Sequence, residues 1–331
     1  MIPLERYTVS QIRVAATCPR IHYFDAAHTR ANAQARPTVT RIWTAGDGEA
    51  AGGTLFHRIV EGFNRQAATQ PDVAAAIARH TDAGPLGRDL HFFINHHCID
   101  LGALAKKSVA LRQNLIGTLE QYVGELSHII VQGLAQGIAP AQVIAQLFGD
   151  SRRRVDVTFR VGDQAQAHVV GQIDYVFYDW RVRKHRIFDY KLTPPSAPEK
   201  DLFQIHTYAL MHHHQHQTRP DLAVFYLHPK RQLFEASWEQ VYAQRNVVYG
   251  ILASMVGWSR YDEATGAGLK PPGNPSYCGK CRWSSVCEAR LGPKSEGARD
   301  TRWEELASAK GDAMPGVDVR VPPAIVEKAD D

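Results

Sequence analysis

Several features that mark large classes of proteins are scarce or absent in this sequence of 331 residues. No stretch is long and apolar enough to span a bilayer, so we expect no membrane-spanning segment. The chain has only five cysteines and no apparent secretory leader, so we expect the reducing environment of the cytoplasm. No internal repeat is visible, which argues against a repeat architecture. The phosphate-binding sequence G-x4-G-K-S/T does not occur, so the chain carries no recognisable nucleotide-driven motor.

Excess charge is also small, because 38 basic and 34 acidic residues give a net charge of +4 and a sequence pI near 8.8. This balance is more weakly basic than that of a dedicated nucleic-acid-binding protein. Basic residues are instead concentrated in three short segments, 152–154, 181–186 and 230–231. The last two are expected at strand ends, where they could flank a cleft or lie at solvated hairpin tips. The hydrophobic content of 44% supports a sizeable core, in one large domain or two.

Two segments that favour β-strands contain charged residues. Both are rich in β-branched and aromatic side chains; the first, residues 169–178, contains Asp174, and the second contains Asp189-Tyr190-Lys191. Because side chains alternate along a strand, Asp189 and Lys191 are predicted on one face and Tyr190 on the other. Charges in the middle of strands are unfavourable unless they are paired or bind metal, which favours a site. Taken alone, however, an Asp-x-Lys pattern is more often an ion pair on the exposed face of a hairpin.

Four of the five cysteines form a second group. Cys278 and Cys281 have C-x2-C spacing, Cys287 follows after five residues, and Cys18 lies about 260 residues earlier in the chain. In a reducing compartment this spacing favours metal binding over disulfides. A zinc site with four cysteines usually has two close pairs, whereas a group of three with a distant fourth better suits an iron–sulfur cluster. Zinc stays an alternative, and Cys98 has no partner at ligand spacing.

Two predicted helices carry further polar candidates. The helix over residues 54–64 projects His57 beside its apolar side, and a later helix carries Gln204 and Tyr208 one turn apart. On its own, a lone histidine is more often a surface residue, and the later pair more often a polar helix edge with a half-buried tyrosine. The four histidines of residues 212–216 are predicted to end the later helix rather than to bind metal.

Five local motifs, taken in their order along the chain, carry a resemblance to a known family. They are a segment ending in Cys18-Pro19-Arg20, a helix with His57, a Gly171-x-x-Asp174 strand, an Asp189-x-Lys191 strand followed by Gln204-x3-Tyr208, and the terminal C-x2-C-x5-C. Their combination resembles the RecB-type branch of the PD-(D/E)xK nuclease superfamily. Within it, the chain is similar to the iron–sulfur nucleases: the CRISPR-associated adaptation nucleases, the AddB subunits of helicase-nucleases, the flap-processing helicase-nucleases and exonuclease V. The motifs cover residues 7–24, 50–65 and 153–290.

The resemblance implies an α/β fold with a restriction-endonuclease-like core, in which helices flank a central mixed sheet. A helical insertion and an iron–sulfur cluster that joins the N- and C-terminal segments complete the expected architecture. The expected segments are a first-cysteine segment (1–24), a loop and the His57 helix (25–65), the helical insertion (66–150), the nuclease core (151–260), the cysteine cluster (261–290) and a disordered or partner-binding tail (291–331). Within the insertion, residues 104–136 have the apolar periodicity of a long helix, which could serve as a scaffold or as a clamp over the substrate.

The chemistry that the resemblance implies is metal-dependent hydrolysis of DNA phosphodiesters. Asp174, Asp189 and the Tyr190 carbonyl are expected to hold Mg²⁺ or Mn²⁺ through hard oxygen ligands, with His57 completing the coordination shell. Lys191 is expected to orient or deprotonate the attacking water, or to stabilise the phosphate. Because a lysine beside two carboxylates normally stays charged, the positioning and electrostatic role is favoured. His57, Asp174, Asp189 and Lys191 form the expected catalytic set.

The resemblance assigns the remaining candidates as well. Cys18, Cys278, Cys281 and Cys287 would hold a [4Fe-4S] cluster, which is expected to be structural. Gln204 and Tyr208 would contact the DNA strand or Lys191. Tyr23, Tyr190 and Tyr208 are candidates for stacking on bases, although each is more often a core residue. Many relatives carry a glutamate on the preceding strand, where this chain has Asp156. Asp156 could be an accessory ligand, but it is expected to be a plain exposed residue.

The expected substrate is a DNA end or DNA with a single-stranded part, in repair, CRISPR adaptation or phage defence. Because the chain lacks a motor motif, any unwinding would come from another protein. The alternative is a DNA-handling subunit of an integrase- or helicase-containing complex, with little activity of its own. An iron–sulfur redox sensor without hydrolysis would leave Asp174, Asp189 and Lys191 unexplained.

Overall fold

The computed structural model describes residues 5–34, 49–100, 104, 107–149, 153–161, 165–192, 198–227, 232–274, 278 and 281–291. The predicted basic segment 230–231 and the tail after residue 291 lie outside these ranges. The elements follow in the order β1 (Glu5–Thr8), α1 (Val9–Thr17), α2 (Pro19–Gln34), α3 (Glu49–Ala67), α4 (Pro71–Arg79), α5 (Ala83–Phe93), the π-helix η1 (Ile94–Cys98), α7 (Val109–Ala135), α8 (Pro140–Phe148), β2 (Arg153–Val161), β3 (Ala165–Ile173), β4 (Tyr175–Asp179), β5 (Lys184–Lys191), α9 (Pro198–His216), β6 (Asp221–Tyr226), β7 (Gln232–Ala236), α10 (Trp238–Ala243), α11 (Arg245–Ser259) and α12 (Ser284–Leu291). This mixture of strands and helices confirms the predicted α/β class. None of the described helices combines the length and the apolar character needed to cross a bilayer.

The strands form two mixed sheets, which corrects the expectation of a single central sheet. One sheet has the order β1-β3-β2 and the other β4-β5-β6-β7, and each contains one parallel pair. The strand predicted over residues 169–178 breaks at Asp174, the one residue between β3 and β4. In a continuous strand Ile173 and Tyr175 would point to the same face, but here they enter different hydrophobic cores. The break at Asp174 therefore allows one segment of chain to serve two cores.

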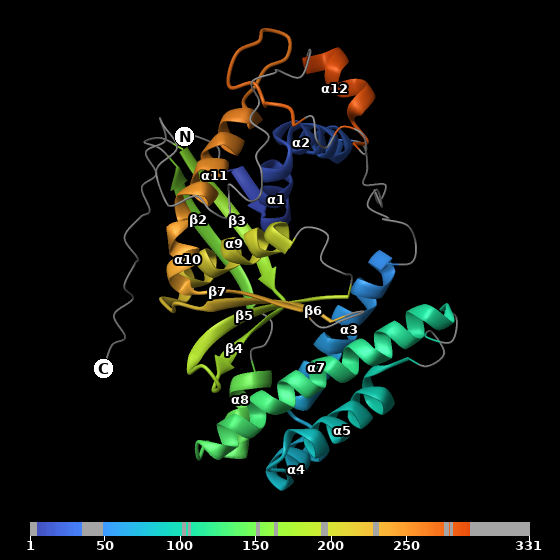
Figure 1. Cartoon of the computed structure of the whole chain (residues 1–331). Helices are drawn as coiled ribbons and strands as arrows, with labels where there is room; N and C mark the ends of the chain where they lie inside the picture. The colour runs from blue at the N-terminus through green and yellow to red at the C-terminus, as the bar shows by residue number, and fades with distance from the viewer. Residues whose placement is uncertain are drawn as a thin grey trace.

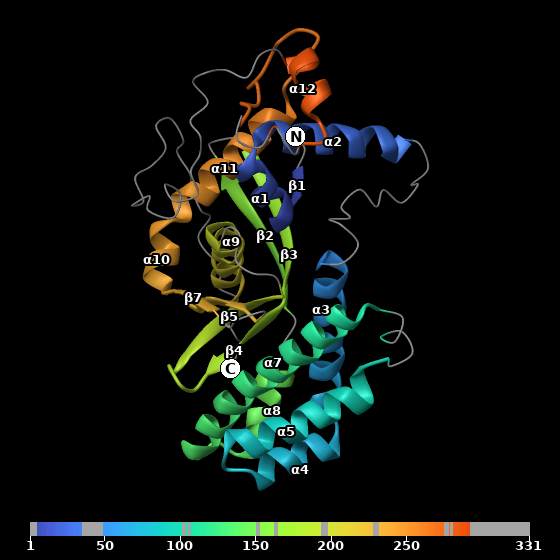
Figure 2. The same ribbon diagram turned by 45° about the vertical axis from the view of Figure 1, so that its right-hand side comes forward.

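The four-stranded sheet lies between two layers that are visible in Figures 1 and 2. Because alternate residues of its strands point to opposite faces, Ile187 and Val224 join a first core with the other sheet, α1, α9 and α11. Phe188, Tyr190 and Phe225 join a second core with α3, α4, α5, α7 and α8. Every described element that lies wholly within residues 66–150 is a helix. These helices cover one face of the four-stranded sheet.

The long helix of this layer is α7. The Ser108 hydroxyl accepts a hydrogen bond from Leu111 N at 3.2 Å, so the helix begins at Val109 rather than at residue 104 as the periodicity predicts. Its apolar side is fully buried against the sheet and its neighbouring helices through Leu115, Leu119, Tyr122, Leu126 and Ile130.

The basic segment 181–186 lies at the end of the β4–β5 hairpin that is remote from the Asp-x-Lys motif. Arg181 pairs with Asp179 and with Glu125 of α7, and Arg186 also pairs with Asp179. Burial alone would raise the pKa of Asp179, but the two arginines outweigh burial and hold the pKa below its ordinary value. These charges attach the helical layer to the sheet. Arg186 also pairs with the exposed Glu235. Because the segment lies at the hairpin end remote from the Asp-x-Lys motif, it does not flank a cleft at that motif, and the alternative of a hairpin tip agrees with its position.

The first-cysteine segment begins with a short strand, which precedes its first helix. β1 pairs in parallel with β3, and Thr8 then begins α1 through a capping box with Gln11. α2 continues to Gln34, although a loop is predicted over residues 25–52, and residues 35–48 lie outside the described part of the chain.

Candidate active site and cysteine cluster

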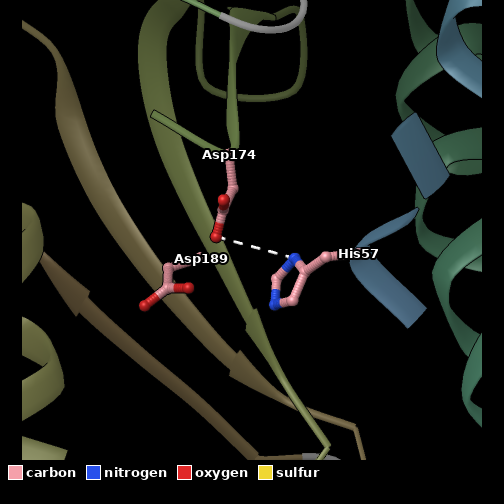
Figure 3. A group of neighbouring side chains, drawn as sticks. All are labelled: His57, Asp174 and Asp189. Carbon is pink, nitrogen blue, oxygen red and sulfur yellow. Dashed lines mark ion pairs between the residues drawn. The ribbon is translucent and has the colours of Figure 1, made fainter. Parts of the chain in front are cut away.

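Three side chains that could hold a metal ion converge where β3 ends and β4 begins. Asp174 lies at that break, Asp189 lies near the end of β5, and His57 approaches from α3 (Figure 3). Each residue offers one ligand atom, and these three atoms all lie within 4.8 Å of one another. His57 Nδ1 is 3.6 Å from Asp174 Oδ2. Among the described His, Cys, Asp and Glu residues, these three form the group close enough to share one ion. The structure thus brings together the three side chains that the sequence motifs indicate.

The orientation of His57 follows from the packing of α3. Phe56, Ile59 and Phe63 are buried in the second core, so the imidazole projects from the adjacent side of the helix. The His57 side chain is 35% exposed and that of Asp174 is 43% exposed, which leaves both reachable from solvent.

The Asp189 carboxylate provides the test of whether these residues fit a cation. Its side chain is 5% exposed, and Lys191 Nζ lies 2.8 Å from its Oδ2 as an ion pair. Within the described residues, no further hydrogen-bond donor reaches either carboxylate oxygen. A buried carboxylate with so few partners is unfavourable unless another cation satisfies it. Two carboxylates and an imidazole are suitable ligands for Mg²⁺ or Mn²⁺, so the residues present fit a divalent cation.

The backbone of β5 offers a further oxygen at this point. The Lys191 carbonyl accepts a hydrogen bond from Leu227 N at 2.9 Å, so this peptide group points toward β6. Backbone polar groups of successive strand residues point to alternate edges, which directs the Tyr190 carbonyl toward the β4 side. Since β4 pairs with β5 only as far as Phe188, this carbonyl lies beyond the last ladder pair, next to the break between β3 and β4.

Lys191 lies between two carboxylates. Its Nζ is 2.8 Å from Asp189 Oδ2 and 3.7 Å from Asp201 Oδ1. Burial alone would lower the pKa of Lys191, but these carboxylates outweigh burial and raise the pKa above its ordinary value. Sequence motifs did not indicate Asp201, which also accepts a hydrogen bond from the Tyr226 hydroxyl at 2.6 Å. Its position one helical turn before Gln204 is the signal that could have identified it.

Gln204 and Tyr208 lie on one side of α9, and both make contacts within the protein. Gln204 Oε1 accepts a hydrogen bond from Arg13 at 2.8 Å. Tyr208 is 9% exposed, and its ring lies against Gly171, where an added Cβ would come within 2.5 Å of the ring. Burial raises the pKa of Tyr208, and the nearby Asp174 carboxylate raises it further. Contact of either residue with DNA stays a prediction.

Two of the three candidate metal ligands, His57 and Asp174, line a cleft of about 390 Å³ between α3 and the start of β4. Its lining consists of Thr54, His57, Arg58, Val60, Glu61, Asn64, Asp174, Tyr175 and Tyr190. A cleft of this volume exceeds what a metal ion needs and falls in the range of small-molecule sites. Thr54, Arg58 and Glu61 lie within the His57 helix motif but were not singled out as site residues. Asn64 lies beyond that motif, and its spacing of two helical turns from His57 could have identified it.

The tyrosines proposed for base stacking are largely buried, although Tyr190 contributes to the lining of this cleft. Tyr23, Tyr190 and Tyr208 are 7%, 2% and 9% exposed, so each is part of a core. Their alternative role as core residues is therefore the correct one.

The four candidate cluster cysteines come together from distant parts of the chain. Cys18 follows α1, Cys278 and Cys281 precede α12, Cys287 lies within it, and all four line one small pocket. All five cysteines of the chain are free thiols. Burial raises the pKa of Cys281, and the three neighbouring thiols add to this effect. Arg20 N–H donates toward Cys287 Sγ at 3.5 Å, so the pocket has a cation at its wall.

Two other candidates lie away from both sites. The histidines of residues 212–216 end α9 as predicted, and three of them contact Thr218 or Tyr249. Asp156 is exposed on β2, as expected, and pairs with His168 at 3.1 Å.

Comparison with known protein families gives one match that bears on this site. The family model of the PD-(D/E)XK nuclease superfamily matches residues 6–288, from β1 into α12. This range includes His57, Asp174, Asp189 and Lys191 and most of the chain. No curated protein matches the chain significantly. The match over most of the chain, together with a site of two carboxylates and a lysine on adjacent strands, shows that the chain belongs to the PD-(D/E)XK nuclease superfamily, a family of metal-dependent nucleases.

Proposed function

We propose that this protein is a deoxyribonuclease that hydrolyses DNA phosphodiesters with Mg²⁺ or Mn²⁺. The observation that carries the proposal is the convergence of two carboxylates and an imidazole beside a charged lysine. His57, Asp174, Asp189 and the Tyr190 carbonyl would hold the cation. When bound, the cation supplies an activated water and neutralises negative charge on the phosphate.

Lys191 supplies fixed positive charge next to this position. Because its carboxylate neighbours raise its pKa, the ammonium is protonated at neutral pH and does not act as a general base. It attracts and orients a phosphate oxygen and stabilises the charge that develops there during cleavage. Asp201 is a second carboxylate partner of the ammonium, at 3.7 Å, and helps to fix its position.

We propose DNA ends or DNA with a single-stranded part as the substrate. The absence of the sequence G-x4-G-K-S/T supports this substrate, since the chain has no recognisable means of opening a duplex. For the same reason we propose a partner that supplies unwinding or integration, in repair, CRISPR adaptation or phage defence.

We further propose that Cys18, Cys278, Cys281 and Cys287 hold a structural [4Fe-4S] cluster. A single tetrahedral zinc, with bonds of about 2.3 Å to sulfur, requires sulfur atoms only about 3.8 Å apart. The described thiols share a pocket but are not among the groups close enough to share one ion. This wider spacing supports a multi-iron cluster over zinc.

Digestion of end-labelled DNA by the full chain tests the proposed activity. Single-stranded, flapped and blunt duplex DNA are compared in Mg²⁺, in Mn²⁺ and in EDTA. We expect metal-dependent cleavage of the first two substrates and none in EDTA. Asp174→Ala, Asp189→Ala and Lys191→Ala should each lower the rate by roughly 10²–10³-fold or more, because each removes charge that stabilises the transition state.

The matched control is Asp156→Ala, which removes an exposed carboxylate from β2 outside the site and should leave the rate unchanged. Cleavage at the wild-type rate by any of the three active-site variants would contradict the proposed site. Equal cleavage of blunt duplex and single strand would instead contradict the proposed substrate and favour a duplex endonuclease.

A further inference from the structure

One aromatic ring of the helical layer contacts the sequence neighbour of each side-chain metal ligand. Tyr122 of α7 is 0% exposed. Its ring centroid lies 6.1 Å from that of Phe56, 6.3 Å from that of Tyr175 and 5.1 Å from that of Tyr190. The interplanar angles are 89°, 82° and 87°, so all three contacts are edge-to-face. The three contacted residues directly adjoin the histidine and the two aspartates of the candidate site.

The contacted rings also pack on one another. The Tyr190 ring is 6.3 Å from that of Phe56 and 6.3 Å from that of Tyr175. All of these rings are at most 2% exposed, so none can move without displacing its neighbours. Consecutive Cα atoms are only about 3.8 Å apart, and therefore a shift of a ring-bearing residue is passed to the ligand beside it.

The Tyr122 hydroxyl is held as well as the ring. It donates a hydrogen bond to Asn64 Oδ1 at 3.0 Å, and the hydroxyl of the neighbouring Tyr175 donates to the Leu147 carbonyl at 3.3 Å. Burial raises the pKa of Tyr122, so the phenol stays neutral. Since Asn64 lines the cleft, the hydroxyl connects α7 to the α3 side that presents His57.

We propose that Tyr122 is a positioning residue that sets the spacing of His57, Asp174 and Asp189 from behind the site. This inference rests on the proposed metal-dependent activity. It gives the helical layer a role in the active site: α7 holds together three segments that are distant in sequence and that carry the three ligands. A purely stabilising role of α7 would not make cation affinity depend on this one ring.

The test compares Tyr122→Leu and Tyr122→Phe with Phe93→Leu. Phe93 belongs to the same core, is 6% exposed and packs on Phe63 and His97. Each protein is titrated with Mn²⁺ without DNA, and the dissociation constant is obtained from the electron paramagnetic resonance of free Mn²⁺. Thermal unfolding followed by circular dichroism measures stability in the same samples.

Tyr122→Leu should weaken Mn²⁺ binding by roughly 10- to 100-fold, the effect typical of groups that orient metal ligands. Tyr122→Phe keeps the ring and should retain most of the affinity. Phe93→Leu should lower the midpoint of unfolding but leave the Mn²⁺ affinity at the wild-type value. Wild-type affinity in folded Tyr122→Leu, or an equal loss in Phe93→Leu, would overturn the inference.

Tyr122→Met provides the same test if the leucine variant does not fold, because methionine fills irregular gaps without supplying a ring. Weakened Mn²⁺ binding in this variant supports the inference, and wild-type binding overturns it. Wild-type protein that binds no Mn²⁺ at all would overturn the metal site itself, and the positioning role with it.

Discussion

At the scale of single residues, the Asp201 carboxylate interacts with several groups around the candidate site. Lys191 and Arg13 both approach this carboxylate, at 3.7 Å and 3.6 Å, and the Tyr226 hydroxyl donates to it. Asp201 therefore links the lysine to α1 and to β6. Its side chain is 21% exposed, so these interactions are partly shielded from solvent.

Asp201→Asn should lower single-turnover cleavage at saturating metal by about 10-fold or more, in the range seen when supporting groups of a metal site are changed. The change removes one of the two carboxylates that raise the pKa of Lys191, but an amide can still accept the Tyr226 hydrogen bond. Single-turnover rates measured with end-labelled DNA report the effect, with Asp156→Asn as the exposed control. A rate equal to that of the wild type would exclude a positioning role for Asp201.

His206 of α9 provides a prediction for acid stability. Burial lowers the pKa of His206 to about 4, whereas an unfolded chain has the ordinary value of about 6.5. Below pH 6.5 the unfolded state therefore binds the proton more readily than the folded state. Keeping this ring neutral in the folded state contributes about 3 kcal/mol to the free energy of unfolding. This contribution is fully present above pH 6.5 and is lost as the pH falls toward 4.

His206→Gln cannot take up this proton, so its free energy of unfolding should fall less steeply than that of the wild type between pH 6.5 and 4. Urea unfolding at a series of pH values measures the slope. His96→Gln, which changes an exposed histidine, should keep the wild-type slope. Identical slopes for His206→Gln and the wild type would show that His206 does not resist protonation in the folded state.

The candidate metal ligands were predictable because each lies in a short motif whose chemistry is evident locally. Asp174, Asp189 and His57 are polar residues beside apolar runs, and the structure brings them within 4.8 Å. Asp201 and Tyr122 were not predictable in the same way. Their roles depend on contacts with residues that are distant in sequence, and neither differs locally from an ordinary exposed acid or core tyrosine.

At the scale of elements, the approach of α9 to β3 depends on a single glycine. A Cβ at Gly171 would lie 2.5 Å from the Tyr208 ring and 2.9 Å from Val9 Cγ2, closer than real contacts allow. Gly171→Ala should therefore destabilise the protein by about 1–3 kcal/mol, the usual range for overpacking.

Urea unfolding measures this change, and Gly62→Ala on α3 is the matched control. A Cβ at Gly62 meets no described atom within 4 Å, so that variant should be neutral or more stable by about 0.5–1 kcal/mol. A Gly171→Ala variant as stable as Gly62→Ala would mean that α9 and β3 are not tightly packed.

The sequence periodicity predicts that most of the helices and strands exist. It does not predict the residues at which they begin and end. The break at Asp174 occurs because Ile173 and Tyr175 enter different cores, and no local pattern reveals two cores. β1 is only four residues long, and its partner strand begins at Ala165. The helical segment from Trp238 to Ser259 is divided at Gln244 into α10 and α11.

At the scale of the whole molecule, the cysteine pocket joins the beginning and the end of the described chain. Arg20 of α2 donates hydrogen bonds to the Pro271 carbonyl at 3.2 Å and to the Leu291 carbonyl at 3.5 Å. Trp283 stacks on Phe24, with ring centroids 5.5 Å apart. α2 and α12 are thus held together by polar and aromatic contacts around the four thiols.

Cys18→Ser should remove the brown colour, with broad absorption at roughly 400 nm, that a thiolate-bound iron–sulfur cluster confers. It should also lower the free energy of unfolding by up to about 4–5 kcal/mol, by analogy with a disulfide that closes a loop of similar length. Absorption spectra and urea unfolding of anaerobically prepared protein measure both effects.

Cys98→Ser is the control, because Cys98 lies in η1, away from the pocket, and should keep both the colour and the stability. Colourless wild-type protein that contains zinc after anaerobic preparation would contradict the proposed cluster.

The parallel pairing of β1 with β3 constrains the order in which a newly synthesised chain can fold. Glu5 pairs with Ala167, so at a synthesis rate of about 5–20 residues per second β1 waits roughly 10–30 s for its partner. During this interval its backbone is an unpaired edge that a chaperone or another nascent chain could bind. Asp189 and Lys191 emerge later still, so more than half of the chain must leave the ribosome before a nascent molecule can cut nucleic acid.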